Sequence, residues 1–188
     1  MPVPDDAWVL LCAARLEPVK GIAYLLSAIA QLPVAIAGRP LHVVILGDGP
    51  LRNTLVKQAQ QMGIAARLHW AGWVNDPAPY YQRADLVVFP SQPQETLGNV
   101  ILEAWAYGVP LLTTASRGAV ELCRHGVDTW RVPCADPKSL GLAIQQLLQE
   151  QTLRLDLAAA GSQRVRRDFS KRTIVGQYQE LYARLAGH

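Results

Sequence analysis

The sequence lacks the continuous apolar run that a membrane-spanning helix requires. Its most apolar stretch, residues 25–37, is short and is interrupted by Ser27, Gln31 and Pro33. The three cysteines form no CxxC pair and show no metal-ligand spacing with the four histidines, which indicates neither a disulfide framework nor a zinc site. The opening stretch has no basic segment of the kind that begins a secretory signal. We therefore expect a protein of a reducing compartment, the cytoplasm, with buried thiols.

Charged side chains are also scarce, at 18% of the 188 residues, whereas hydrophobic residues make up 50%. This composition is typical of a globular chain, and the length suits one well-cored domain spanning residues 1–188. The net charge of +3 is compatible with an anionic ligand, a membrane surface or nucleic acid. The cluster Arg164, Arg166 and Arg167 is interpreted as a solvated helix face. Aromatic residues do not interleave with basic ones, which disfavours a nucleic-acid interface.

Short apolar stretches alternate with segments of helical periodicity along the chain. The stretches predicted as strands are 7–14, 41–47, 67–72, 85–90, 110–114 and 129–133. The segments predicted as helices or helical turns are 21–32, 51–63, 77–84, 98–108, 119–126, 136–150, 152–167 and 170–186. Strands that are apolar throughout are typical of a parallel sheet covered on both faces. The sequence therefore predicts an α/β fold, a single Rossmann-like, doubly wound domain with a mostly parallel, six-stranded sheet.

In such a sheet, ligands bind beyond the carboxyl ends of the strands, so the residues after each strand are the candidates for a site. Arg15 and Lys20 follow the first strand and suit phosphates, one as a planar fork and the other as a point charge. Gly98 stands where a loop turns into a helix, whose free N–H groups and dipole favour an anion. Together these features predict a diphosphate ligand. The GxGxxG fingerprint is absent after the first strand, and "GDGP" (47–50) is at most a fragment of it, which disfavours a nicotinamide enzyme.

Two glutamates, Glu95 and Glu103, are separated by seven residues in "PQETLGNVILEAWAYGVP" (93–110). Glu95 belongs to the loop before the predicted helix and Glu103 to the second turn of that helix. Both are expected near the carboxyl edge of the sheet without facing each other. A carboxylate accepts several hydrogen bonds and suits the paired hydroxyls of a ribose or a hexose. The alternative, that both glutamates merely complement the dipole of a helix N-terminus, stays open at this point.

Five segments in a fixed order resemble the C-terminal domain of the retaining glycosyltransferases of family 4, also called group 1: "ARLEPVKG", "ILGDGPLR", "HWAGWVND", "YYQRADLVVFPS" and "PQETLGNVILEAWAYGVPLLTT". The resemblance covers nearly the whole chain, including "FSKRTIVGQYQELYARL" near its end. "LGNV", one hydrophobic residue and "LEAW" resemble members that build bacterial lipopolysaccharide core or related surface glycans. The family has the GT-B fold, in which two such domains face a cleft. The resemblance implies that this chain is the donor-binding half and that the N-terminal acceptor domain is absent from it.

The same resemblance implies roles for individual residues. Arg15 and Lys20 would hold the donor diphosphate, and Glu95 would contact the hydroxyls of the donor sugar, so that these three form the catalytic set. Val74 would meet the nucleobase largely through its backbone, and Glu103 would bind the ribose hydroxyls. The backbone that lines the sugar and phosphate would come from five consecutive residues: Thr96, Leu97, Gly98, Asn99 and Val100.

The resemblance also implies the ligands and partners. The substrate would be a UDP- or GDP-linked sugar, with no cofactor and no metal, because the chain has no DxD motif. We expect the isolated chain to bind a donor nucleotide weakly and to transfer no sugar without the N-terminal domain. The acceptor would be a glycan or a lipid-linked molecule, met by the full enzyme at the inner face of the cytoplasmic membrane. No nucleic-acid partner is expected.

Two alternatives are retained. A nucleotide-sugar epimerase shares the GT-B architecture, but it would need acid and base carboxylates and histidines in both domains, and this chain shows no such set. A non-catalytic nucleotide-sugar-binding module is the other alternative. Among the remaining candidates, His42 and His69 are predicted to be structural, and Tyr80 and Tyr81 are predicted to pack rather than bind. Trp73 is the exception, because it lies in the presumed base-binding loop.

Overall fold

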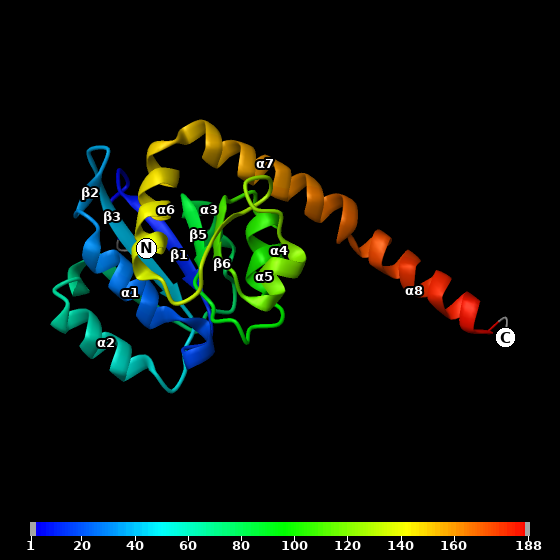
Figure 1. The fold of residues 1–188 in the computed structure, drawn as a ribbon, viewed down its shortest axis with the longest axis horizontal. Helices are drawn as coiled ribbons and strands as arrows, with labels where there is room; N and C mark the ends of the chain where they lie inside the picture. Colours follow the sequence, from blue (N-terminus) through cyan, green and yellow to red (C-terminus); the bar gives the residue numbers. More distant parts are fainter. Residues whose placement is uncertain (1–2, 187–188) are drawn as a thin grey trace.

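A seven-stranded sheet, parallel except for one short strand, forms the centre of the computed structural model, which describes residues 3–186 (Figure 1). Its six longer strands are β1 (Trp8–Ala13), β3 (Arg39–Leu46), β4 (Leu68–Gly72), β5 (Leu86–Phe89), β6 (Leu111–Thr114) and β7 (Trp130–Val132). They coincide with the six predicted strands, which confirms the α/β fold class. Residues 1–2 of the opening stretch and residues 187–188 at the other end lie outside the described range.

The strand order places the loops after β1 and β5 next to each other. The order is β2-β3-β1-β5-β6-β7, with β4 also paired to β3. The chain builds outward from β1 through β3 and β4, and then places β5 on the other side of β1. Leu10 of β1 is in register with Val43 of β3 and with Leu86 of β5. The strand order therefore reverses between β1 and β5, and ligands of doubly wound sheets bind at such a point.

Besides the six predicted strands, the sheet has a seventh, short strand, β2 (Ala35–Ile36), which precedes β3 and was not predicted. It runs antiparallel to β3 and pairs Ile36 with Arg39. The connecting turn holds Ala37 at φ 49° and Gly38 at φ 78°, which are the two left-handed residues of a tight hairpin. Alanine rarely adopts this conformation, and two residues are too few to show alternation. The sequence pattern therefore carries no clear signal for this hairpin.

Helices cover both faces of the sheet, and each face has its own apolar cluster (Figure 1). One face carries α1 (Ile22–Gln31), α2 (Arg52–Gln61) and α6 (Pro137–Gln149), and the other carries α3 (Ala78–Arg83), α4 (Asn99–Ala106) and α5 (Arg117–Leu122). Two short 3-10 helices, η1 (Pro18–Lys20) and η2 (Ala65–Arg67), lie in loops. In β1, Leu10 belongs to the first cluster and its neighbours Val9 and Leu11 to the second. Burying each such side chain contributes about 1.5–3 kcal/mol before the cost of ordering the chain.

The predicted burial of the thiols is confirmed for Cys12 and Cys123, whereas Cys134 is half-buried. Burial raises the pKa of the Cys12 thiol to about 12 and that of the Cys123 thiol to about 11, because a thiolate would lose its hydration. Both thiols are therefore protonated at neutral pH and serve as small apolar side chains.

The chain ends in two long helices, α7 (Gln151–Asp168) and α8 (Lys171–Ala186). α7 packs on α4, and Gly161 allows the approach because a Cβ there would lie 2.2 Å from the ring of Trp105. α8 extends away from the domain and has no buried residue (Figure 1). Within residues 3–186, no helix is both long and apolar enough to cross a bilayer.

The arginine cluster on α7 is only partly a solvated face. Arg166 and Arg167 are exposed, as predicted. Arg164 is not, since its side chain is 14% exposed and pairs with the buried Asp128 at 2.7 Å. Its guanidinium also lies over the Trp105 ring, 5.2 Å from the ring centre. The ion pair with the Asp128 carboxylate, whose burial no sequence pattern predicted, explains why Arg164 is not exposed.

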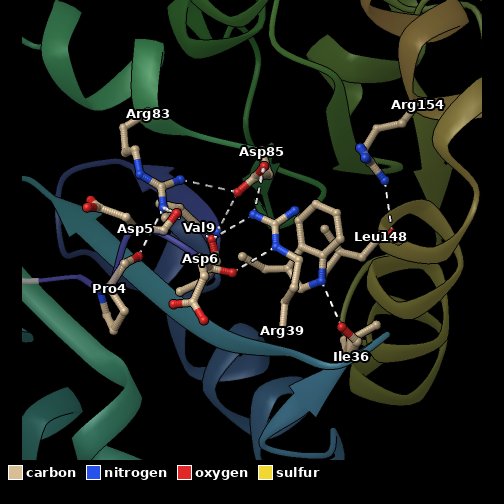
Figure 2. A network of polar contacts seen from close by, with 12 residues as sticks. Pro4, Asp5, Asp6, Val9, Ile36, Arg39, Arg83, Asp85, Leu148 and Arg154 are labelled. Atoms are coloured by element: carbon tan, nitrogen blue, oxygen red, sulfur yellow. Dashed lines mark hydrogen bonds and ion pairs between the residues drawn. The ribbon is translucent and has the colours of Figure 1, made fainter.

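Arginines also fix the amino edge of the sheet (Figure 2). Asp85, just before β5, accepts a hydrogen bond from the backbone N–H of Val9 at 2.8 Å. The same carboxylate lies 3.5 Å from a guanidinium nitrogen of Arg83 and 3.8 Å from one of Arg39. Arg83 donates in addition to three backbone carbonyls of the segment 4–7, at 3.0–3.2 Å. The strands β1, β3 and β5 are thus tied together where they begin.

The ring of Trp8 also contacts residues of this network. The guanidinium groups of Arg39 and Arg154 lie 3.6 and 4.8 Å from its ring centre, within the range of cation–π contacts. Its indole N–H donates to the carbonyl of Ile36 at 2.8 Å. Arg154 donates to the carbonyl of Leu148 at 3.0 Å. All of these partners belong to the protein itself.

Candidate functional site

The loops after β1 and β5 are held together at the carboxyl edge of the sheet. The backbone N–H of Gln92 donates to the carbonyl of Val19 at 2.8 Å. Gly21, which follows η1, has φ 67°, and a Cβ on it would lie 2.0 Å from the carbonyl oxygen of Pro90. A glycine is required here for two reasons, the left-handed backbone and the close approach of the neighbouring loop. Gly21 follows Lys20 directly, so this contact also positions the Lys20 side chain.

Lys20 and Glu95, which are 75 residues apart in the sequence, form an ion pair across these two loops. The Nζ of Lys20 donates to Oε2 of Glu95. The Glu95 side chain is 9% exposed and that of Lys20 is 20% exposed, so the pair is largely withdrawn from water. The structure therefore brings two of the three predicted catalytic residues together. Each depends on the other for the compensation of its charge.

The loop that carries Glu95 is anchored by the start of α5. The backbone N–H groups of Arg117 and Gly118 donate to the carbonyls of Pro93 and Glu95, at 3.3 and 3.0 Å. Gly118 permits this approach, because a Cβ there would lie 2.4 Å from the carbonyl oxygen of Thr96. The position of the loop is thus decided by its neighbour in space rather than by its own sequence.

Thr96, Leu97 and Gly98 end this loop with free backbone N–H groups. Within residues 3–186, these three N–H groups donate to no acceptor, and the residues Thr96 and Leu97 are exposed. Asn99 and Val100 follow as the first residues of α4, where N–H groups have no partner inside the helix. Free N–H groups at a helix start favour an anion, and the helix dipole adds about 0.3–1 kcal/mol at an exposed position.

Arg15, the third predicted catalytic residue, has a different ion-pair partner. Its side chain is 74% exposed, and its guanidinium pairs with Glu17 at 2.8 Å. Arg15 lines a hollow of about 420 Å³ between the loops that follow β1, β3 and β4. Val74, half-buried, and Trp73, 74% exposed, line the same hollow. The other lining residues are Ala13, Ala14, Leu46, Gly47, Asp48 and Pro77.

Glu103 lies in the second turn of α4 and is half-buried. Its Oε2 accepts a hydrogen bond from the hydroxyl of Tyr81 at 2.6 Å. Glu95 and Glu103 therefore have different partners. Tyr81 is fully buried, as its predicted packing role requires, but the prediction missed that its hydroxyl binds one of the two glutamates.

The "GDGP" turn after β3, which had little weight in the sequence, shapes this edge of the sheet. Gly47 has φ 117°, and a Cβ on it would lie 2.1 Å from the carbonyl oxygen of Ala14. Gly49 also approaches Leu16, with 2.7 Å from a Cβ built on it to the backbone nitrogen of Leu16. The carbonyl of Asp48 accepts the N–H of Leu16 at 3.0 Å. Gly47 and Gly49 were the signal in the sequence from which this turn could have been recognised. They permit close contact between two loops and do not form part of a dinucleotide-binding motif.

Comparison with known proteins decides the family. A family model described as "Glycosyl transferases group 1" matches residues 2–164 of the chain. The chain belongs to the group 1 glycosyltransferases. Two curated relatives are the lipopolysaccharide core biosynthesis glycosyltransferases LpsE and LpsD of Rhizobium meliloti, which are 34% and 30% identical over 97% and 98% of this chain. The match covers 52% of either relative, so the chain spans about half of their length.

Solved structures agree with the fold of this glycosyltransferase domain. HepE from Anabaena, solved in complex with UDP, is 25% identical and superposes with a TM-score of 0.87 over 95% of this chain and 49% of its own. The C-terminal domain of the group 1 protein LpcC from Francisella tularensis is 19% identical and matches 87% of both chains with a TM-score of 0.77. The predicted Rossmann-like domain of a GT-B enzyme is therefore confirmed.

Buried hydroxyl groups behind the Glu95 loop escaped sequence reasoning. Ser91 follows β5, Thr114 ends β6, and both are at most 3% exposed. The hydroxyl of Thr114 donates to the carbonyl of Ser91, and the thiol of Cys134 lies 3.5 Å from the same oxygen. These contacts join the ends of two strands beneath the site of this glycosyltransferase domain. Within the described range, no group of three or more His, Cys, Asp or Glu side chains could hold a metal ion, and metal independence stays a prediction.

A larger hollow, of about 640 Å³, lies beside β4 and α3, away from the reversal point of the strand order. His69 lines it, and His42 and His69 face each other with ring nitrogens 2.9 Å apart. Burial lowers the pKa of both imidazoles, and the nearby charge of Arg67 lowers that of His42 further. Both rings are neutral at pH 7 and satisfy each other, in agreement with the structural role predicted for them.

Proposed function

We propose that this chain binds a nucleotide-diphosphate sugar as the donor half of a retaining glycosyltransferase. One observation carries the proposal: Lys20 and Glu95 form an ion pair at the point where the strand order reverses. The loop that carries Glu95 continues into the free N–H groups of Thr96 to Gly98. A cation and free N–H groups suit a diphosphate, and a carboxylate suits sugar hydroxyls. Family membership supports this function, and so do the structures of HepE with UDP and with UDP-glucose.

In this proposal the nucleoside occupies the hollow of about 420 Å³. Val74 meets the base, and the exposed indole of Trp73 offers an apolar wall next to it. Arg15, at the rim of the hollow, reaches toward the diphosphate as a long and mobile cation. Glu103 accepts the hydroxyls of the ribose.

The diphosphate and the sugar lie along the loop before α4. Lys20 and the N–H groups of Thr96, Leu97 and Gly98 hold the phosphate oxygens, with Asn99 and Val100 at the start of the helix completing the backbone cradle. Glu95 accepts hydroxyls of the donor sugar. Because Lys20 is paired with Glu95, a bound donor has to share this ion pair between its phosphate and its sugar.

Chemistry follows from this placement. As the bond between the sugar and the phosphate breaks, negative charge grows on the departing diphosphate. Lys20, Arg15 and the N-terminus of α4 stabilise that charge, which is electrostatic catalysis by groups fixed in advance. The acceptor attacks from the face that the diphosphate leaves, so configuration is retained. Glu95 supports the donor sugar at the same place.

The acceptor side and the biological role are part of the same proposal. Because the chain spans about half the length of its curated relatives, we propose that transfer requires a second, N-terminal acceptor domain. Relatives named for lipopolysaccharide core synthesis in Rhizobium meliloti and for capsular polysaccharide synthesis in Staphylococcus aureus favour a bacterial surface glycan as the product. The reaction would then take place on the cytoplasmic side of the membrane.

Calorimetric titration of the chain with UDP, GDP, ADP and UDP-glucose tests the proposal. We expect one nucleotide to bind selectively, and Lys20→Ala to weaken it by about tenfold or more, since a charge-assisted contact is lost. Arg15→Ala and Glu103→Ala should weaken the same nucleotide.

The matched control is Lys171→Ala, which removes an exposed cation from α8, away from the site. It should leave the affinity unchanged. Equal affinity in all variants, or no binding at millimolar nucleotide, would contradict the proposal, and the second result would favour a site completed by the other domain.

A further inference from the structure

The Glu103 carboxylate has a negative charge that no cation among the described residues balances. Among residues 3–186 it takes part in no ion pair, and its Oε1 accepts no hydrogen bond. The residue is half-buried, so part of its hydration is lost. Its partner is the hydroxyl of Tyr81. A carboxylate with one oxygen held and the other free is arranged to receive donors from outside the protein.

Tyr81 is itself held at two points, by Glu103 of α4 and by Tyr107 at the C-terminal end of that helix. Its hydroxyl donates to Oε2 of Glu103 at 2.6 Å, and its ring stacks on Tyr107 with 4.8 Å between ring centres and 10° between planes. Glu103 lies in α4, and Tyr107, four residues later, is the C-cap of that helix and keeps helical backbone angles, so the two side chains lie on one face. Tyr81 is 0% exposed, and burial followed by the bond to Glu103 raises the pKa of its hydroxyl far above the ordinary value. The hydroxyl therefore remains a hydrogen-bond donor at physiological pH.

The same tyrosine belongs to an apolar cluster that also reaches the wall of the nucleoside hollow. Tyr81 belongs to the apolar cluster that includes Leu46, with Ala13 and Val74 packed against it. These three residues also line the hollow of about 420 Å³. Tyr81 thus shares its apolar cluster with part of the wall of this hollow.

We propose that Tyr81 is a positioning residue for the donor, which holds Glu103 so that its free oxygen accepts ribose hydroxyls. This inference rests on the proposed function, in which Glu103 is the ribose-binding carboxylate. A buried tyrosine hydroxyl requires some acceptor. Here the acceptor is a carboxylate that pairs with no cation within residues 3–186, and a charge-assisted bond of this kind fixes its orientation more firmly than a neutral one.

The test is the preference of the chain for a ribose over a sugar without its hydroxyls. Calorimetry would compare UDP with 2′,3′-dideoxy-UDP, or the corresponding pair for the nucleotide that binds best. The unmodified chain should prefer the ribonucleotide by roughly 10- to 100-fold. Tyr81→Phe, which keeps the ring, should lower that preference by about 3- to 10-fold, and Glu103→Gln should lower it at least as much.

The matched control is Tyr80→Phe, which removes a hydroxyl from the neighbouring residue of α3. Within the described residues the Tyr80 hydroxyl makes no hydrogen bond, so the preference should not change. The ratio of two affinities is insensitive to a general loss of stability, because both nucleotides meet the same folded fraction. Should Tyr81→Phe fail to fold, Tyr107→Ala at a 40% exposed position loosens the same contact and should lower the ratio.

The outcomes separate the inference from the function on which it rests. An unchanged ratio in Tyr81→Phe, with a lowered ratio in Glu103→Gln, overturns the role of Tyr81 alone. No preference in the unmodified chain overturns the ribose contact of Glu103, and the positioning role with it. No nucleotide binding at all overturns the proposed donor site and both of its consequences.

Discussion

The two edges of the sheet use their charged residues in opposite ways. At the amino edge, Arg39 and Arg83 contact Asp85, and Arg83 and Arg154 spend their donors on backbone carbonyls (Figure 2). These partners are supplied by the fold and leave little hydrogen-bonding capacity for a ligand. Such a network satisfies backbone groups and ties strands together, so its contribution is to stability.

At the carboxyl edge the charges are compensated less completely. Lys20 and Glu95 pair with each other, Arg15 pairs with Glu17 on a side chain that is 74% exposed, and among residues 3–186 Glu103 has a single, neutral partner, Tyr81. Free N–H groups stand beside them at the start of α4. The difference teaches where to look for function in this fold: at the edge where polar groups keep unused capacity, rather than where they are most numerous.

The largest effect is expected from Gly21→Ala, which would break the contact between the loops after β1 and β5. The new Cβ would lie 2.0 Å from the carbonyl oxygen of Pro90, on a backbone with φ 67°. Strain and the forced separation of the loops should together cost about 2–4 kcal/mol in free energy of unfolding, measured by urea denaturation. Nucleotide affinity should fall as well, because Lys20 would move.

Gly63→Ala is the control for that comparison. Gly63 has nearly the same φ, 69°, but a Cβ there would meet nothing within 4 Å. Only the conformational strain remains, about 1 kcal/mol. Equal losses in the two variants would show that the close approach of the loops contributes nothing.

Asp85→Ala should destabilise the amino edge without touching the ligand. It leaves the N–H of Val9 without its acceptor and two arginines without their carboxylate, which should cost about 2–3 kcal/mol in urea denaturation. Nucleotide affinity should stay unchanged when the folded chain is titrated. The control is Asp156→Ala, which removes an exposed carboxylate of α7 and should change neither the free energy of unfolding nor the affinity. A loss of affinity in Asp85→Ala would contradict the proposed difference between the two edges.

At the carboxyl edge, changes to the ion pair of Lys20 and Glu95 should affect nucleotide affinity even where the free energy of unfolding is restored. Lys20→Met leaves Glu95 with a largely buried and unpaired charge, which should cost about 1–3 kcal/mol. Adding Glu95→Gln to the same chain should restore much of that stability, because the uncompensated charge is gone. Nucleotide affinity should not return, since the cation is still missing. Recovery of both quantities in the double variant would mean that the pair acts on the ligand only through the fold.

The smallest effect concerns pH and lies outside both edges. Burial lowers the pKa of His42 and His69 below the ordinary value of about 6.5. At pH values between the lowered pKa and 6.5, the unfolded chain binds more protons than the folded one. The contribution of the two histidines to the free energy of unfolding is therefore fully present above pH 6.5 and decreases as the pH falls below it. His69→Gln should therefore reduce the loss of melting temperature between pH 7.5 and pH 5.5. His125→Gln, at an exposed position, is the control, and an equal reduction there would contradict the assignment.

Much of the fold could be predicted because its signals are local. An apolar stretch such as 85–90 predicts a strand, and Asp136 before Pro137 predicts the start of a helix. The helix cap is present, because the backbone N–H of Ser139 donates to the Asp136 carboxylate at 3.0 Å. The strand β2 could not be predicted, because it depends on a turn that alanine rarely makes. Arg164 was misjudged for a similar reason, since the buried Asp128 that attracts it lies 36 residues away.

By itself the sequence determined the order of the six longer strands, their two-sided burial, and the kinds of group that follow each of them: cations after the first, and a carboxylate and a glycine after the fourth predicted strand, β5. These are properties of neighbouring residues. Only the tertiary structure decided that Lys20 meets Glu95 across 75 residues and that Tyr81 holds Glu103 across 22. The physical reason is that such pairs depend on the reversal of the strand order and on close backbone contacts such as that of Gly21. Neither can be predicted from the residues that are neighbours in the sequence.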